Sequence, residues 1–225
     1  MTGSATGTGP DSRVEPAELR LRVFLLSPAH CGGKRAAILL NQHATFPLAQ
    51  RLRSSAGVTL GEAFSFLSGL YFRGKLAYAH RFARPPQSSP GVQVITTYRG
   101  LLPADTLVRA GELAEFGAVD IRSDQPAYRL PLTRDVSTLA GIPDVEAVLL
   151  GSIATGKYID VLLELMGERL LFPREFVGRG DMSRGALLLR AARSGQELEY
   201  EPVAGAIRRG RRAPRVGPPS RTQPA

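Results

Sequence analysis

The sequence is short of the residues on which several classes of protein depend. It contains 1 cysteine and 3 histidines among 225 residues. A single cysteine excludes an internal disulfide framework and a cysteine-rich zinc site, and the scattered histidines give no metal-ligand spacing, so we expect neither a metal nor a cofactor. No run of about 18 uncharged apolar residues occurs, which predicts no membrane span. The first residues lack a basic region followed by an apolar run, which favours a cytoplasmic protein.

Positive charge is in excess, and it is unevenly distributed. Lys and Arg total 29 against 20 Asp and Glu, so the net charge is +9, a balance that favours nucleic-acid partners. Residues 207–225 hold six arginines, four prolines and no acid. Residues 1–18 are rich in Gly, Thr, Ser and Pro. We expect a disordered leader over 1–18, a disordered basic tail over 207–225 that carries +6, and one domain over 19–206 that carries only +5.

Short apolar runs alternate with helical patterns through the central part of the chain. The strands that we expect are residues 21–26, 92–96, 145–150 and 169–172. The helices that we expect are residues 34–43, 47–54, 60–82, 105–116, 132–140, 157–167 and 182–193. Strand, loop and helix in repeated order predict an α/β fold, in which helices flank a parallel or mostly parallel sheet in three layers.

A polar loop that contains glycine follows each of these strands or lies a few residues beyond it. The loops are residues 27–35, 96–100, 151–158 and 178–185. Ligands of open α/β sheets bind beyond the carboxyl ends of the strands, next to helix N-termini, so we expect the loops to converge on one crevice. The candidate ligand-binding residues in and near it are Ser27, Lys34, Arg35, Arg73, Lys75, Arg99, Lys157, Arg179, Ser183 and Arg184.

The first loop is similar to a phosphate-binding P-loop but does not match it. Pro28 stands where the motif has its first glycine, and Arg35 replaces the hydroxyl that binds magnesium. The backbone amides of Gly32 and Gly33, together with Lys34 and Arg35, could still hold an anion. The alternative is a glycine turn that leads into the basic first turn of a helix.

The last loop, residues 178–185, carries the most suggestive chemistry. Arg179 and Arg184 offer planar guanidinium groups to a phosphate or carboxylate. Asp181 is the candidate catalytic residue, either as a general base or as a group that recognises a sugar or base edge. Capping of the following helix by Asp181 or Ser183 is the alternative role.

Two other segments have both a functional and a structural interpretation. Residues 71–78 interleave aromatic side chains with Arg73 and Lys75, as nucleic-acid-binding surfaces do. The structural interpretation, which we favour, is a helix with its aromatic side chains in the core and its cations in water. Cys31 follows His30 at an expected helix start, where a thiolate nucleophile would be favoured. A small buried residue is the commoner role of a single cysteine.

The order of motifs resembles a known family. The segments 27–29 (Ser-Pro-Ala), 98–105 (Tyr-Arg-Gly-Leu-Leu-Pro-Ala-Asp) and 156–158 (Gly-Lys-Tyr) are together similar to the YaaA-like peroxide-stress proteins. They are also similar to the related uracil-DNA-glycosylase-like domains of tRNA base-modifying enzymes. The resemblance covers about residues 21–190, and it implies handling of nucleic acid or a nucleobase without a metal cofactor.

These features predict a protein that binds a phosphate-bearing ligand, either a nucleotide or nucleic acid, in the strand-end crevice, with no membrane partner. Action on a nucleobase or nucleotide is left open. The alternative is a non-catalytic interaction module that binds nucleic acid through its basic tail. A third hypothesis is a thiol-dependent enzyme that uses Cys31.

Overall fold

A computed structural model describes residues 20–121, 124–154 and 156–207. The main sheet has six strands in the order β4-β3-β1-β6-β7-β8. Their bounds are β1 Leu21–Leu26, β3 Val92–Ile95, β4 Leu101–Pro103, β6 Val145–Leu150, β7 Leu170–Pro173 and β8 Tyr200–Pro202. The four central strands are parallel, and β4 and β8 pair antiparallel at the two edges. The structure therefore confirms the α/β fold with a mostly parallel sheet. The leader at 1–18 and the arginines of the tail lie outside the described residues.

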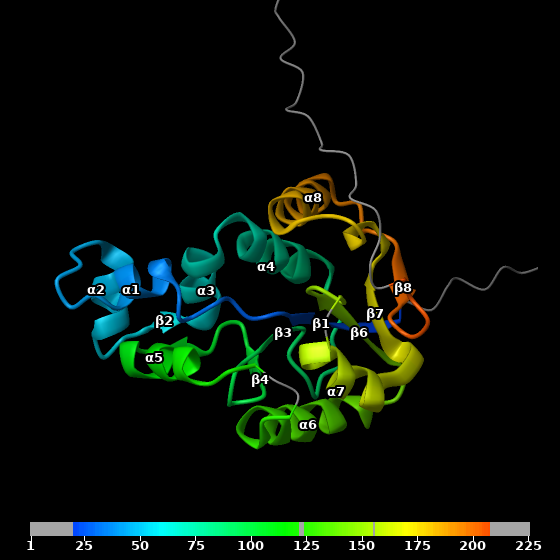
Figure 1. Ribbon diagram of the computed structural model, residues 1–225. Helices are drawn as coiled ribbons and strands as arrows, with labels where there is room; N and C mark the ends of the chain where they lie inside the picture. The colour runs from blue at the N-terminus through cyan, green and yellow to red at the C-terminus, as the bar shows by residue number, and fades with distance from the viewer. Residues whose placement is uncertain (1–19, 122–123, 155, 208–225) are drawn as a thin grey trace, which may run out of the picture.

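Helices cover both faces of this sheet. On one face lie α4 (Leu70–Phe82) and α8 (Asp181–Ser194), and on the other lie α6 (Pro126–Ala140) and α7 (Gly156–Met166) (Figure 1). Every residue of β3 and β6 is buried. Strands covered on both faces have no solvent-facing side, which is why these two are mostly apolar rather than alternating, with one buried polar residue each, Gln93 and Glu146.

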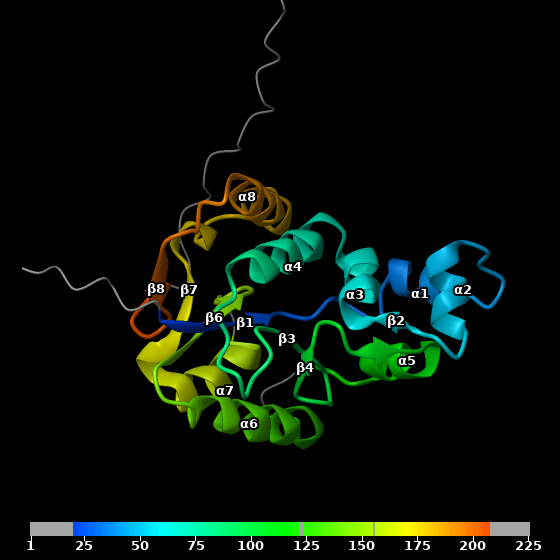
Figure 2. The ribbon, with the colours of Figure 1, turned by 180° about the vertical axis from the view of Figure 1, so that it is seen from behind.

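The remaining helices gather at one side of the sheet, next to the segment that follows β1 (Figures 1 and 2). They are α1 (Lys34–Leu40), α2 (Pro47–Arg53), α3 (Leu60–Ser68) and α5 (Ala110–Ala118). A two-stranded antiparallel sheet of β2 (Val58–Thr59) and β5 (Leu107–Val108) lies among them. Because α1 follows β1 directly, this group stands on the side of the carboxyl ends of the parallel strands.

The helix expected over residues 60–82 is in fact two helices. Gly69 has φ of 61°, in the left-handed region that favours glycine, and it ends α3 and begins α4. Thr59 caps α3: its hydroxyl accepts from the Glu62 amide, and the Glu62 carboxylate accepts from the Thr59 amide. A break at Gly69 turns α4 onto the sheet, which is what brings Lys75 to the site described below.

Several smaller expectations were wrong. Residues 101–103, to which neither a helix nor a strand was assigned from the sequence, form β4 against β3, and Gly100, whose φ is 67°, precedes that strand. Helix α5 begins later than expected and α6 begins earlier. The strands β2, β4, β5 and β8 were not expected, because two or three residues carry no measurable periodicity. The short 3-10 helices η1 (Gly167–Arg169) and η2 (Arg174–Phe176) were also not expected. None of the helices in the described residues is long and apolar enough to span a bilayer.

Candidate functional site

The main sheet has a topological switch point between β1 and β6. The chain continues from β1 to β3 on one side, whereas it continues from β6 to β7 on the other. Where the connections of two adjacent strands diverge, open α/β sheets bind ligands outside the carboxyl ends of those strands. The residues directly after β1 and β6 are Ser27 and Gly151. A ligand site is therefore expected around these two residues.

A buried lysine reaches this point from α4. Lys75 Nζ donates to the Ser27 carbonyl oxygen at 2.6 Å and lies 3.0 Å from Ser27 Oγ. The residue is only 1% exposed, and the rings of Tyr71 and Phe72 lie within 4.7 Å of the nitrogen. Burial lowers the pKa of Lys75 to about 7, because removal of the ammonium from water penalises the charged form. Among charged neighbours, Asp181 opposes this lowering of the pKa and Arg184 adds to it.

Gly151 allows Tyr158 to approach Ser27. A Cβ atom at position 151 would lie 2.8 Å from both Ser27 Cβ and Tyr158 Oη, so a larger residue would push these groups apart. Tyr158, in the first turn of α7, accepts from the Ser152 amide and donates to the Ser152 carbonyl oxygen, both at 3.0 Å. Burial raises the pKa of Tyr158, and hydrogen bonding with Ser27 and Ser152 opposes the rise. The segment after β6 is thus folded directly onto the end of β1.

The start of α8 brings a carboxylate and a guanidinium to the same region. Both Asp181 and Arg184 are close enough to Lys75 to influence its pKa. Arg184 donates from Nε and Nη2 to the Phe176 carbonyl oxygen at 3.1 and 2.9 Å. Its Nη1 lies 3.9 Å from Asp181 Oδ1, and the Asp181 side chain is 72% exposed. Arg184 is therefore held in place by the protein, whereas the Asp181 carboxylate faces solvent.

Two glycines set the distance between α4 and α8. A Cβ atom at Gly74 would lie 2.6 Å from the Gly185 carbonyl oxygen, and one at Gly185 would lie 2.8 Å from backbone atoms of α4. Rotation of a side chain cannot relieve contacts with backbone atoms, so the two helices pack in direct backbone contact. Since Lys75 follows Gly74 and Arg184 precedes Gly185, this packing keeps the two cations near each other.

An unsatisfied hydroxyl lies in the same region. Tyr71 Oη is buried and has no hydrogen bond of normal geometry within the described part of the chain. Burial raises the pKa of Tyr71, and the neighbouring charge of Arg184 opposes the rise. We name these residues the switch-point cluster; its members are Ser27, Tyr71, Lys75, Gly151, Tyr158, Asp181 and Arg184.

The loop after β3 does not contact the cluster directly in any interaction of the described residues, and α5 lies between it and the first loop. Thr97 donates from its hydroxyl to the Phe116 carbonyl oxygen at 3.0 Å. Next along α5, a Cβ atom at Gly117 would lie 2.9 Å from the Cys31 carbonyl oxygen. Arg99 is paired with Glu112 at 2.8 Å. The loops after β1 and β6 thus meet directly at Ser27 and Gly151, whereas the loop 178–185 meets α4, the helix that carries Lys75, and the loop after β3 lies against α5.

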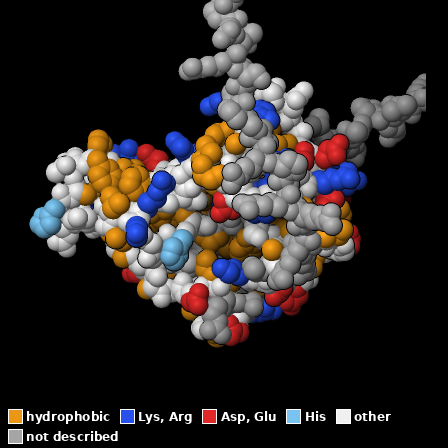
Figure 3. All heavy atoms as spheres, turned by 45° about the horizontal axis from the view of Figure 1, so that its top comes forward, with side chains coloured by type: hydrophobic (Ala, Val, Ile, Leu, Met, Phe, Trp, Pro, Cys, Tyr) orange, Lys and Arg blue, Asp and Glu red, His pale blue; other side chains and the backbone are white. Residues whose placement is uncertain are grey.

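Most of the other predicted cations lie on the surface. Lys34, Arg73 and Lys157 are exposed. Arg35 is also exposed and donates to the Phe66 carbonyl oxygen at 3.1 Å. Figure 3 shows Lys and Arg side chains interspersed with apolar and acidic ones on the face that it presents. Lys34 and Arg35 belong to α1, Arg73 to α4 and Lys157 to α7, so these four cations are spread over three helices.

The structure decides several alternatives left open by the sequence. Arg179 donates to Ser183 Oγ at 3.1 Å, and the N-cap of α8 is Gly180 without a side-chain cap, so neither Asp181 nor Ser183 caps the helix. Arg73 lies in water as expected of a helix cation, but Lys75 does not. The expectation for Lys75 was wrong because its face of α4 packs against the end of β1.

Cys31 is a small buried residue rather than a thiolate. Its thiol donates to the Ala29 carbonyl oxygen at 3.5 Å, and it is 6% exposed. Burial raises the pKa of Cys31 to about 12, the opposite of what a nucleophilic thiol needs. Among the described residues there is no group of three or more His, Cys, Asp or Glu side chains suited to holding a metal ion.

Sequence reasoning did not select Tyr71, Gly151 or Tyr158. Gly151 and Tyr158 belong to the loop 151–158, in which only Lys157 was predicted, because charged side chains are the usual ligands of phosphate. For Gly151 and Tyr158 the signal in the sequence was a glycine directly after a mostly apolar strand and a tyrosine seven residues later. Neither has meaning before the strand order is known.

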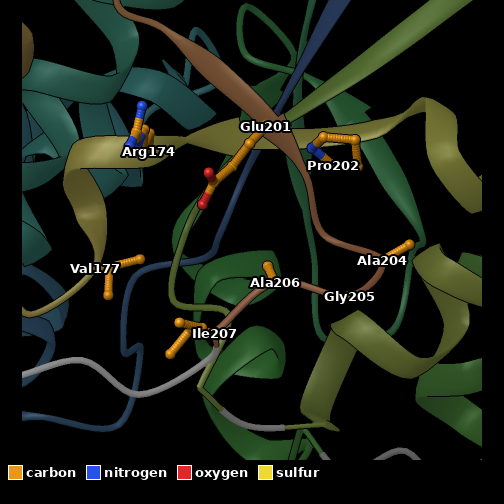
Figure 4. A pocket seen from close by; sticks show the side chains of 8 residues that line it. All are labelled: Arg174, Val177, Glu201, Pro202, Ala204, Gly205, Ala206 and Ile207. Carbon is orange, nitrogen blue, oxygen red and sulfur yellow. The ribbon is translucent and has the colours of Figure 1, made fainter.

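A hollow of about 560 Å³ lies beside β7 and β8 (Figure 4). The residues that line it are Arg174, Val177, Glu201, Pro202, Ala204, Gly205, Ala206 and Ile207. It shares no residue with the switch-point cluster or with the predicted site residues.

No family model, curated protein or solved structure matches the chain. The resemblance to YaaA-like and uracil-DNA-glycosylase-like domains therefore stays a prediction.

Proposed function

We propose that the protein binds a phosphate-bearing ligand, a nucleotide or nucleic acid, at the switch-point cluster. The observation that carries the proposal is the meeting of the segments after β1 and after β6 outside the carboxyl ends of two central parallel strands, with Lys75 of α4 bound to the first of them and the first turns of α8 packed on α4. Open α/β sheets bind ligands at this position.

Arg184 is the group best suited to a phosphate. Two of its nitrogens are held by the Phe176 carbonyl oxygen, so its guanidinium is already oriented before a ligand arrives. A guanidinium stays charged at every physiological pH and matches the geometry of phosphate oxygens. The buried Tyr71 hydroxyl supports the proposal, because it lies near the Arg184 guanidinium without a hydrogen bond of normal geometry and a bound ligand could supply a better partner.

The other predicted residues extend this binding site. Lys34, Arg35 and Arg73 are exposed on helices beside the cluster, where they would contact further phosphates of a nucleic acid. Asp181 presents an exposed carboxylate, suited to act as a general base or to accept hydrogen bonds from a sugar or base edge. A cytoplasmic location belongs to the same proposal, since nucleotides and nucleic acids are available there.

A double substitution tests the proposal. Arg179→Ala with Arg184→Ala should weaken binding of ATP or of a single-stranded oligonucleotide at least tenfold, because each charge-assisted hydrogen bond contributes about 1.5–3 kcal/mol. Binding is measured by calorimetry or by fluorescence anisotropy at two salt concentrations.

The matched control is Arg129→Ala with Arg134→Ala, which removes the same charge from α6 on the opposite face of the sheet. Folding of all variants is checked by circular dichroism. Equal affinities of the wild type and the Arg179/Arg184 variant, or affinities that do not respond to salt, would refute the proposal.

A further inference from the structure

Ser27 and Lys75 are paired in a way that phosphate binding does not require. The lysine nitrogen donates to the Ser27 carbonyl oxygen at 2.6 Å, which fixes the nitrogen 3.0 Å from Oγ of the same residue. Lysines normally extend to water, and a fully buried lysine is rare unless it is paired with a carboxylate. Among the residues that the structure describes, no carboxylate forms an ion pair with Lys75. A buried amine without a counter-ion, beside a hydroxyl, is the arrangement of a lysine general base.

We propose that Ser27 is a nucleophile with Lys75 as its general base, and that the protein transfers the acyl group of an ester to water. This activity goes beyond ligand binding and does not depend on it. Serine and lysine form such pairs on several unrelated folds, where the lysine takes the place of the histidine of a catalytic triad.

The chemical step balances with the residues at hand. Ser27 Oγ forms a bond to the ester carbonyl carbon, and its proton passes to the lone pair of Lys75 Nζ. The bond from that carbon to the leaving oxygen breaks, and the departing alcohol takes the proton from Lys75. Water then attacks the acyl-serine in the same way, which releases a carboxylic acid and restores Ser27.

Burial and position agree with these roles. Ser27 is 8% exposed and Lys75 is 1% exposed, so both groups are shielded from water and the serine is the more accessible of the two. The pKa of Lys75, about 7, leaves a substantial fraction of the amine unprotonated at neutral pH. Tyr158 is a positioning residue, because its hydroxyl packs against Ser27 across Gly151.

The groups around the amine come from three helices. Tyr71 belongs to α4, Tyr158 to α7, and Asp181 and Arg184 to α8. Both tyrosines have pKa values raised by burial, so they stay neutral while Lys75 titrates. The pH dependence of the serine should therefore follow the lysine.

A fluorophosphonate probe tests the pair on the full chain. The serine oxygen bonds to phosphorus, fluoride leaves and the proton passes to Lys75, so the probe reports the first step without a known substrate. We expect one adduct per chain, located at Ser27 by mass spectrometry, with a rate that rises with pH to a plateau and is half-maximal near pH 7. Ser27→Ala should abolish the adduct, and Lys75→Met should slow it at least a hundredfold.

The control is Ser54→Ala, which alters an exposed serine at the end of α2 and should label as the wild type does. An adduct elsewhere, no adduct on the folded chain, or a rate unaffected by Lys75→Met would overturn the assignment. If Lys75→Met does not fold, the wild-type profile decides, and a rate independent of pH between 6 and 9 overturns it. The probe carries no nucleotide, so the failure of labelling and the failure of nucleotide binding are distinguishable.

Discussion

Raising the pH from 7 to 9 should stabilise the protein, and Lys75→Met should remove that stabilisation. The pKa of the lysine is 10.5 when the group is in water and about 7 in the folded protein. Between these two values the unfolded chain binds a proton that the folded chain does not. The free energy of unfolding therefore increases with pH in this window, and the gain is lost as the pH falls through 7.

The size of the effect follows from the two pKa values. One pKa unit corresponds to about 1.4 kcal/mol, so titration of Lys75 alone adds about 2 kcal/mol between pH 7 and 9 and changes little below pH 7. This corresponds to a rise in Tm of roughly 4–8 °C for a domain of this size. From about pH 8 upward Cys31 begins to oppose the gain, and the tyrosines do so from about pH 9, because burial raises their pKa values and the unfolded chain loses those protons first.

Urea unfolding at pH 6, 7, 8 and 9 measures the effect directly. The wild type should show a nearly flat free energy from pH 6 to 7 and a rise from 7 to 9, whereas Lys75→Met should stay flat throughout. Lys34→Met, which replaces an exposed lysine at the start of α1, should keep the wild-type rise. A wild-type curve without a rise, or the same rise in Lys75→Met, would show that the ammonium is not excluded from the folded protein.

Three further predictions follow from packing, burial and charge. Gly185→Ala should destabilise the protein by about 1–3 kcal/mol in thermal melts, because the new Cβ atom meets backbone atoms of α4. The control is Gly111→Ala, whose Cβ atom has open space and which should not destabilise the protein. Equal effects of the two substitutions would contradict the packing of α4 on α8. Cys31 should resist iodoacetamide at pH 8 in the folded protein and react in urea, and rapid native alkylation would contradict its burial. Deletion of residues 207–225 removes six arginines and should make nucleic-acid binding less sensitive to salt. The slope of log affinity against log salt concentration should decrease in magnitude by up to about 5. Binding of a nucleotide should persist. Loss of both affinities would instead support the tail-binding module.

The positions of the central strands could be predicted because both of their faces are buried. β1 and β6 are mostly apolar runs, each with one charged residue near its start, that end before Ser27 and Gly151, and such runs are visible without any knowledge of their neighbours. The edge strands β4 and β8 could not be predicted in the same way. They have three residues each, and they are strands only because β3 and β7 offer free edges to pair with.

The candidate site was only partly predictable for a related reason. Loops at the carboxyl ends of parallel strands meet on one side of a sheet, so the segments 27–35, 151–158 and 178–185 could be expected to converge. Which residues among them matter depends on the strand order. The switch point lies between β1 and β6, two strands that are adjacent in the sheet but more than a hundred residues apart in the chain.

By itself, the sequence determined the α/β class, the central strands and the side of the sheet on which polar residues gather, because these depend on apolar runs and glycines that are close together in the chain. Only the tertiary structure decided the role of Lys75. Its place among exposed helix cations predicts a side chain in water, but the break at Gly69 and the backbone contact between Gly74 and Gly185 place α4 so that this lysine faces Ser27. The two residues are 48 positions apart, and no local pattern encodes a contact over that distance.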